Sequence, residues 1–273
     1  MTVLPGPESA PRAPDPRSRA GILMAALTRR AQEQFSGTLV LAGDPGGRVR
    51  MQAGLLVTAG TPAAPGPEPL LLRSGRINET AWSEAFAAAA PDGRLAAELV
   101  DRGLLGAAGV EVIAQTSLVD AVFAMALSGV HTCTAEPAGA DQPPPLLPAV
   151  PGMDTDRVIR ETLRRLALAA TWQELGLTVH SRPRATRPDP ARQDLLDRAN
   201  GRRTARDIAF AVGRGLYPVL TDLAALIEDG LVTLSPPTVT LHSRPDPGSD
   251  PELPRRRRGE SSVNTVLPWR PDR

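Results

Sequence analysis

The chain has 273 residues and a formal net charge of +1, and its 31 basic residues are all arginine because no lysine occurs in it. The missing lysine excludes Schiff-base catalysis on a lysine, Walker-type phosphate loops and Ser-x-x-Lys acylases. A single cysteine excludes an internal disulfide and a multi-thiolate metal site, so we expect neither a metal nor a cofactor. With 41% hydrophobic residues the chain should bury a core, whereas 29 prolines indicate long irregular stretches.

The N-terminal part is predicted to be an α+β domain behind an irregular leader. Residues 1–18 are rich in proline and charge, a composition typical of disorder, and the domain is expected over residues 19–136. Apolar residues at helical spacing predict a helix that begins at Gly21 and ends near Phe35. Alternating runs then predict an antiparallel meander packed on helices, with strands at residues 38–42, 48–52 and 55–59.

Helices dominate the rest of this domain. The segment from Thr61 to Pro69 indicates a loop. A helix capped by Asn78 or Thr80 and ended by Asp92-Gly93 is predicted next, followed by helical patterns at residues 95–101 and 109–127. Trp82 and Phe86 are expected on the inner face of the first of these helices. Residues 130–134 then predict a short strand that returns to the sheet.

Two proline-rich segments flank a long helix in the middle of the chain. Residues 137–151 predict a stiff linker, residues 152–178 a connecting helix, and residues 179–190 an exposed linker of Arg and Pro. The inner face of the connecting helix is expected to carry Ile159, Leu163, Leu166 and Ala170. Its outer face carries Arg157, Arg160 and Arg164.

Residues 191–242 have the element order of a winged helix-turn-helix. Three helices are predicted over residues 191–200, 204–212 and 216–229, the second with a Thr204-x-x-Asp207 cap. A hairpin of residues 231–234 and 239–242 closes the module, and residues 243–273 are predicted to be a disordered basic tail.

Segments of both predicted domains resemble known protein families. ANGRRTARDIAFAVGRGLYPVLTDLAALIEDGLV (Ala199 to Val232) resembles the winged helix-turn-helix modules of actinobacterial MarR-like regulators. A weaker resemblance, to the PATAN-type domain of bacterial signalling proteins, rests on the segments SGTLVL, GGRVRMQAGLLVTAG and SGVHTC. This second resemblance implies a protein-interaction domain without chemistry of its own, and such domains are often followed by a winged helix.

The charge of the C-terminal module does not favour DNA. Residues 189–242 hold six arginines against seven carboxylates, a net charge of −1, whereas DNA-binding surfaces are basic. The third helix has no Arg, Asn or Gln, which are the side chains that read guanine and adenine. Its outward residues Tyr217, Thr221 and Asp222 are expected to face either DNA or a protein partner.

Arginines around the helices are the candidates for phosphate contacts, which position a protein on DNA without reading its sequence. These candidates are Arg202, Arg203, Arg206 and Arg214. The alternative is that they are solvated charges balanced by nearby aspartates. The tail adds Arg255, Arg256, Arg257 and Arg258, as a nucleic-acid arm or as solubilising charge, and Trp269 as a candidate docking residue.

The sequence gives little support for an enzyme. His131 and Cys133 lie two residues apart on a predicted strand, but no Asp or Asn at a recognisable spacing completes a Cys-His nucleophile. A pair in the core or on the surface is the alternative, and we expect no catalytic residues. Because no stretch approaches the length of about 20 apolar residues that spans a membrane, a cytoplasmic protein without a membrane partner is expected.

Two functions remain open at this point. The first is a transcriptional regulator whose winged helix binds DNA and whose N-terminal domain senses or interacts. The second is a signalling adaptor whose winged helix docks a protein partner and does not bind DNA. The sequence leaves the oligomeric state open.

Overall fold

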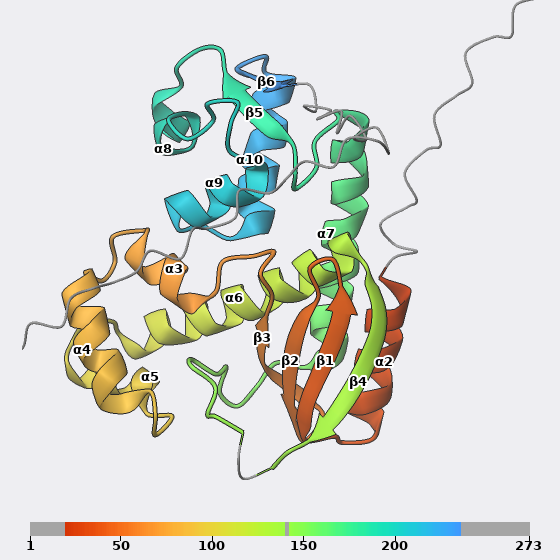
Figure 1. The fold of residues 1–273 in the computed structure, drawn as a ribbon, viewed down its shortest axis with the longest axis vertical. Helices are drawn as coiled ribbons and strands as arrows, with labels where there is room; N and C mark the ends of the chain where they lie inside the picture. The colour runs from red at the N-terminus through yellow and green to blue at the C-terminus, as the bar shows by residue number, and fades with distance from the viewer. Residues whose placement is uncertain (1–19, 140–141, 236–273) are drawn as a thin grey trace, which may run out of the picture. The chain divides into compact units, whose positions relative to one another are not determined.

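The structure, a computed structural model, describes residues 20–139 and 142–235. The predicted leader and basic tail therefore lie outside the described residues. The described residues belong to one compact unit of mixed α+β structure, with an antiparallel sheet and helices, as the sequence predicted (Figure 1).

An antiparallel sheet with the strand order β3-β2-β1-β4 organises the N-terminal part. Its strands are β1 (Gly37–Gly43), β2 (Gly47–Gln52), β3 (Leu55–Gly60) and β4 (Val130–Pro137). This confirms the predicted meander and the return of a later strand to the sheet. Leu39 pairs with Val49 on a buried apolar face, whereas Thr38 pairs with Arg50 on the opposite face.

Three helices share the core of the apolar face: α2 (Gly21–Gln32), α6 (Ala107–Ser128) and α7 (Thr155–Glu174). By length and composition α6 is apolar enough to cross a membrane, which contradicts the expectation that no stretch is. Within its most apolar window, 72% of the residues are buried inside the protein. Phe123 of α6 is fully buried among the side chains of this core.

A second core joins three short helices to the beginning of α6. They are α3 (Pro67–Leu72), α4 (Glu79–Ala89) and α5 (Leu95–Asp101). The predicted loop ends early, because Pro67 occupies the first turn of α3, where its missing N–H does no harm. Trp82 is buried as predicted, but Phe86 is 42% exposed and lies beside the Trp82 ring, with 6.1 Å between centroids.

The proline-rich segment before α7 packs against the N-terminal part. Leu147 is buried in the second core, and the N–H of Ala149 donates to the carbonyl of Val57 in β3 at 2.9 Å. Met153 then pairs with Leu56 as an isolated bridge. Residues 149–153 therefore run along the outer edge of β3.

The buried face of α7 differs from the predicted one. Leu163 is 37% exposed, and Thr162 beside it is fully buried. The sequence pattern favoured the leucine, but a threonine can be buried in a helix when its hydroxyl donates to a carbonyl, as Thr162 does to Val158 at 2.8 Å. The observed inner residues are Thr155, Val158, Thr162, Leu166, Ala169 and Trp172.

The C-terminal part contains short helices and a two-stranded sheet. Its elements are β5 (Arg182–Ala185), η1 (Pro190–Arg192), α8 (Gln193–Leu196), α9 (Ala205–Val212), α10 (Leu216–Glu228) and β6 (Val232–Ser235). The capping box of Thr204 and Asp207 is present at α9, as predicted. The first predicted helix is shorter than expected, being a 3-10 turn followed by α8.

One prediction for this part needs correction, and another falls on residues outside the described ranges. Residues 182–185, expected in an exposed linker, form β5 and pair antiparallel with β6, and Pro183 is buried. Residues 239–242, the predicted partner of β6, lie outside the described residues. The Arg and Pro composition of this segment did not predict a strand, because proline is a poor strand residue except on an edge.

Candidate functional site

The most unusual polar group in the described residues is Asp120, near the middle of α6. Its carboxylate is buried, with 1% of the residue exposed, and it contacts the beginning of α10. Oδ2 accepts a hydrogen bond from the N–H of Leu216 at 2.5 Å, and Oδ1 accepts one from the N–H of Tyr217 at 2.9 Å. The first N–H groups of a helix have no partner within it, and a negative charge there is favourable. Asp120 therefore caps α10 from a distant helix.

Glycine permits this close approach. Gly215 precedes α10, and a Cβ at that position would lie 3.1 Å from Oδ2 of Asp120. Gly213 ends α9 in the left-handed region with φ +64°, and a Cβ there would meet the backbone of Ser74 and Arg73. The turn between α9 and α10 is thus pressed against the N-terminal part at two places.

Tyr217 lies at the centre of an aromatic and cationic cluster. Its ring meets that of Phe123 edge-on, with 5.3 Å between centroids, and that of Trp172 at 5.7 Å. The guanidinium of Arg165 lies 4.4 Å from the Tyr217 centroid, a cation–π contact. The expectation that Tyr217 faces outward needs correction, because the residue is half-buried in the junction with α6 and α7.

Arg165 links this cluster to two carboxylates. Its guanidinium lies 3.7 Å from Oδ1 of Asp120 and donates to Oε1 of Glu161 at 2.8 Å. Hydrogen bonds from Arg164, together with those from Arg165, lower the pKa of Glu161 to about 2. Burial raises the pKa of Asp120, and the N–H groups of Tyr217 and Leu216 and the charge of Arg165 oppose that shift.

Two of the four predicted phosphate-binding arginines are paired with aspartates. Arg214 donates to Asp222 at 2.6 Å, and Arg206 lies 3.7 Å from Asp207, so these two are balanced by aspartates. Arg202 and Arg203 occupy the loop before α9, where their backbone N–H groups donate to the side chain of Asn200. Within the described ranges no carboxylate forms an ion pair with either of them.

The other predicted site residues either lie at separate places in the structure or fall outside the described residues. The hydroxyl of Thr221 donates to the carbonyl of Tyr217 in its own helix at 2.9 Å. His131 lies at the irregularity where the pairing of β4 with β1 shifts, and it is exposed, whereas Cys133 is half-buried. Burial raises the pKa of the Cys133 thiol, which keeps it from being an activated nucleophile. Arg255 to Arg258 and Trp269 lie outside the described residues.

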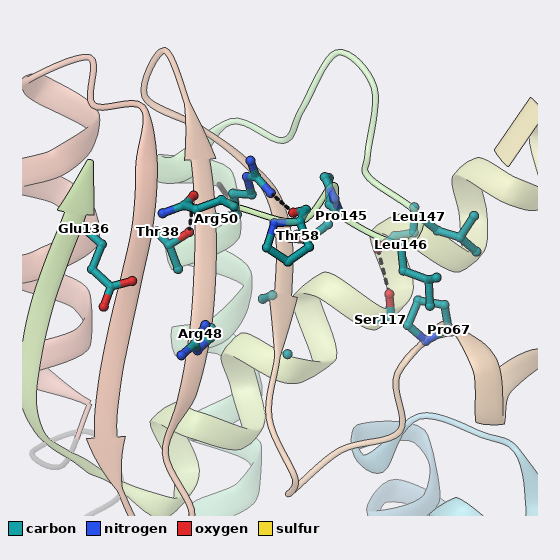
Figure 2. A pocket seen from close by; sticks show the side chains of 15 residues that line it. Thr38, Arg48, Arg50, Thr58, Pro67, Ser117, Glu136, Pro145, Leu146 and Leu147 are labelled. Atoms are coloured by element: carbon teal, nitrogen blue, oxygen red, sulfur yellow. Dashed lines mark hydrogen bonds between the residues drawn. The ribbon is translucent and has the colours of Figure 1, made fainter. Parts of the chain in front are cut away.

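A groove crosses the polar face of the sheet. Figure 2 shows Arg48, Arg50, Thr38 and Glu136 on the strands, with Leu146 and Leu147 on the far wall. The cavity has a volume of about 320 Å³. Arg50 donates to the carbonyl of Pro143 at 2.7 Å, so it holds the crossing segment in place.

Ser117, which lines this groove, is engaged by its own helix. The hydroxyl of Ser117 donates to the carbonyl of Ala114 in its own helix at 3.0 Å. Among the groove's titratable lining residues are Arg48, Arg50 and Glu136, and neither His nor Cys of the described residues lines the cavity.

Asp120 and Arg165 were not singled out from the sequence, although a signal for Asp120 exists. It is the single charged residue between Val112 and Ser128, in a segment that otherwise reads as a buried apolar helix. An ionisable group in such a segment is expected to have a specific partner. The partner, the N–H of Leu216, lies 96 residues away in the sequence, so no local sequence pattern could predict it.

Comparisons with models of protein families, with curated proteins and with solved structures find no match for this chain.

Proposed function

We propose that this protein is a non-enzymatic regulatory adaptor whose C-terminal winged helix docks a protein partner. The module takes in the described residues 182–235. The order of its three helices before β6 supports this assignment, as does the 117° angle between α9 and α10, which is within the range of a helix-turn-helix.

The contact of Asp120 with the first N–H groups of α10 is the observation that carries the proposal. In DNA-binding winged helices the N-terminal residues of the third helix approach base edges in the major groove. Here Leu216 and Tyr217, which occupy that position, are engaged by α6. Reading DNA with this end of α10 would require the loss of both hydrogen bonds and of the aromatic contacts of Tyr217.

The free end of α10 favours a basic protein partner. Glu228 and Asp229 at its C-terminal end are exposed. Among the described residues Asp229 is near one cation, Arg192 at 3.7 Å, and its side chain is 60% exposed. An exposed acidic surface attracts a basic surface and repels phosphates, so a partner protein with Arg or Lys at its interface fits it better than DNA.

Photo-crosslinking from two positions tests the proposal. A photoreactive amino acid is placed at Glu228 in one variant and at Arg202 in another, and the full chain is irradiated in living bacterial cells. We expect protease-sensitive, nuclease-resistant adducts from position 228. Nuclease-sensitive adducts from both positions, together with a gel shift of the wild-type chain at low salt, would overturn the adaptor function.

The second candidate function is DNA binding through phosphates. The observation that favours it is the pair Arg202 and Arg203 on the loop before α9, which have no ion-pair partner in the described residues; Arg202 is exposed and Arg203 is half-buried. A chain that binds DNA in this way loses its low-salt gel shift when both arginines are replaced by alanine. Loss of the shift in this variant, with a normal melting temperature, would favour the regulator over the adaptor.

A further inference from the structure

We propose that a groove between α6 and α7, distinct from the sheet-face groove and from the acidic end of α10, binds a small molecule that carries two phosphate groups. We call it the arginine groove. Its cavity has a volume of about 500 Å³, within the range of small-molecule sites. Its charged lining residues are Arg157, Arg160, Glu161, Arg164 and Arg165.

The spacing of the arginines places them on one side of α7. Arg157, Arg160 and Arg164 are separated by three and four residues, so their side chains are neighbours on the helix surface. Seven residues of helix rise by about 10 Å, so a ligand with two phosphate groups can engage more of these arginines than a single phosphate can. Guanidinium groups bind phosphate oxygens through paired N–H donors.

The charge of the groove is unbalanced. Four arginines face one carboxylate, Glu161, which gives the lining a net charge of +3. Glu161 is already engaged, since Arg164 donates two hydrogen bonds to it and Arg165 donates one. Arg157 and Arg160 form no ion pair with any described residue and are exposed. Their donors are available to a ligand.

Neighbouring acidic residues do not neutralise these arginines. Asp154 caps α7 by accepting from the N–H of Arg157, and together with Asp156 it lines a different cavity beside α2. Asp120 lies behind the groove and contacts only Arg165 among its arginines. Arg157 and Arg160 therefore line the cavity without a carboxylate partner among the described residues.

The uncharged lining residues favour a small ligand over a nucleic-acid backbone. Val119, Met153 and Val158 give the cavity apolar surface, and Thr116 of α6, which is exposed, also lines it. A concave site with apolar surface and few charged groups suits a phosphorylated molecule that also has an apolar or aromatic portion. A duplex would instead need a broad basic surface.

Calorimetric titration with inorganic pyrophosphate at low ionic strength tests this site in the full chain. The variant Arg157→Ala/Arg160→Ala removes the free arginines. The control Arg187→Ala/Arg198→Ala makes the same charge change at exposed residues outside the groove. Charged hydrogen bonds of this kind predict that the first variant binds at least about tenfold more weakly, and that the control stays within about twofold of wild type.

Inorganic phosphate and a short DNA duplex serve as the other two probes. Phosphate should bind more weakly than pyrophosphate, since it reaches fewer of the arginines. Equal affinity of all three proteins for pyrophosphate, or no binding by the wild type, would overturn the proposal. Tighter binding of the duplex through Arg157 and Arg160 would replace it with a nucleic-acid surface. Equal melting temperatures of the variants exclude misfolding as the cause of lost binding.

Discussion

Asp120 of α6 accepts a hydrogen bond from the backbone N–H of Leu216, 96 residues further along the chain, and so caps a helix of the C-terminal part. A capping side chain normally belongs to the residue just before its helix. Here Gly215 occupies that position without a side chain, and the carboxylate comes from the core of the N-terminal part. The stability of α10 is therefore coupled to the position of α6.

Replacing Asp120 by alanine should destabilise the protein by about 3 kcal/mol, because two buried N–H groups and the charge of Arg165 lose their partner. Asp120→Asn keeps one acceptor oxygen and should cost less. Urea unfolding measures both free energies. The control is Asp101→Ala, an exposed carboxylate at the end of α5. If Asp120→Ala unfolds at the same urea concentration as this control, the cap contributes nothing.

Gly213→Ala should be more destabilising than Gly230→Ala. Both glycines have a left-handed backbone, with φ +64° and +69°, so both variants lose about 1 kcal/mol of conformational preference. Only at Gly213 would the new Cβ meet backbone atoms, those of Arg73 and Ser74, whereas the space around Gly230 is open. Thermal unfolding should show an additional loss of about 1–3 kcal/mol at Gly213. Equal losses would mean that this turn is not pressed against residues 73–74.

Phe123→Ala should cost about 3–5 kcal/mol, since it leaves a cavity in a fully buried position and removes the edge-on contact with Tyr217. Phe86→Ala is the matched control. Its side chain is 42% exposed, so we expect a loss below about 1.5 kcal/mol. Chemical denaturation compares the two variants, and a larger loss at Phe86 would contradict the assigned core.

The ion pairs of Glu161 predict a dependence of stability on pH. Its pKa is about 2 in the folded chain against an ordinary 4.5, so its contribution is complete above pH 4.5 and is lost as the pH falls toward 2. Glu161→Gln should therefore be less stable than wild type at neutral pH, by at most about 1 kcal/mol for such partly exposed pairs. The difference should shrink in acid. Unfolding curves across this range, with Glu174→Gln as control, would refute this if the difference grew as the pH fell.

Arg50→Ala should loosen the segment that crosses the sheet-face groove, since Arg50 donates to the carbonyl of Pro143. Hydrogen exchange at residues 146–149 should become faster. Arg48→Ala is the control, because Arg48 lines the same groove and makes no side-chain hydrogen bond to a described residue. Similar exchange in both variants would mean that the proline residues of the segment, and not Arg50, hold it in position.

Local patterns predicted most of the elements. Alternation located β1, β2 and β3 within one or two residues, and the Thr204 cap located the beginning of α9. Errors arose where tertiary contacts override local preference. Thr162 takes the buried place expected for Leu163, and a segment of Arg and Pro becomes β5 because β6 supplies its partner.

The candidate site was less predictable than the fold. The expectation that Tyr217 faces outward was wrong, because its environment depends on Phe123 and Trp172, which lie far from it in the sequence. The Arg157, Arg160 and Arg164 face was visible as a helical pattern. This face borders a cavity because α6 packs against α7, and the sequence pattern gave no information about that packing.

The segment of residues 149–153 has a consequence for self-association. Because it bonds to Val57 and bridges to Leu56, a further strand is prevented from pairing with the outer edge of β3. Among the described residues, no strand lies beyond β4, the other edge strand. Unpaired strand edges are the points at which sheets of different molecules join. Any growth of this sheet into larger assemblies should therefore proceed in one direction, through the backbone of residues 130–137.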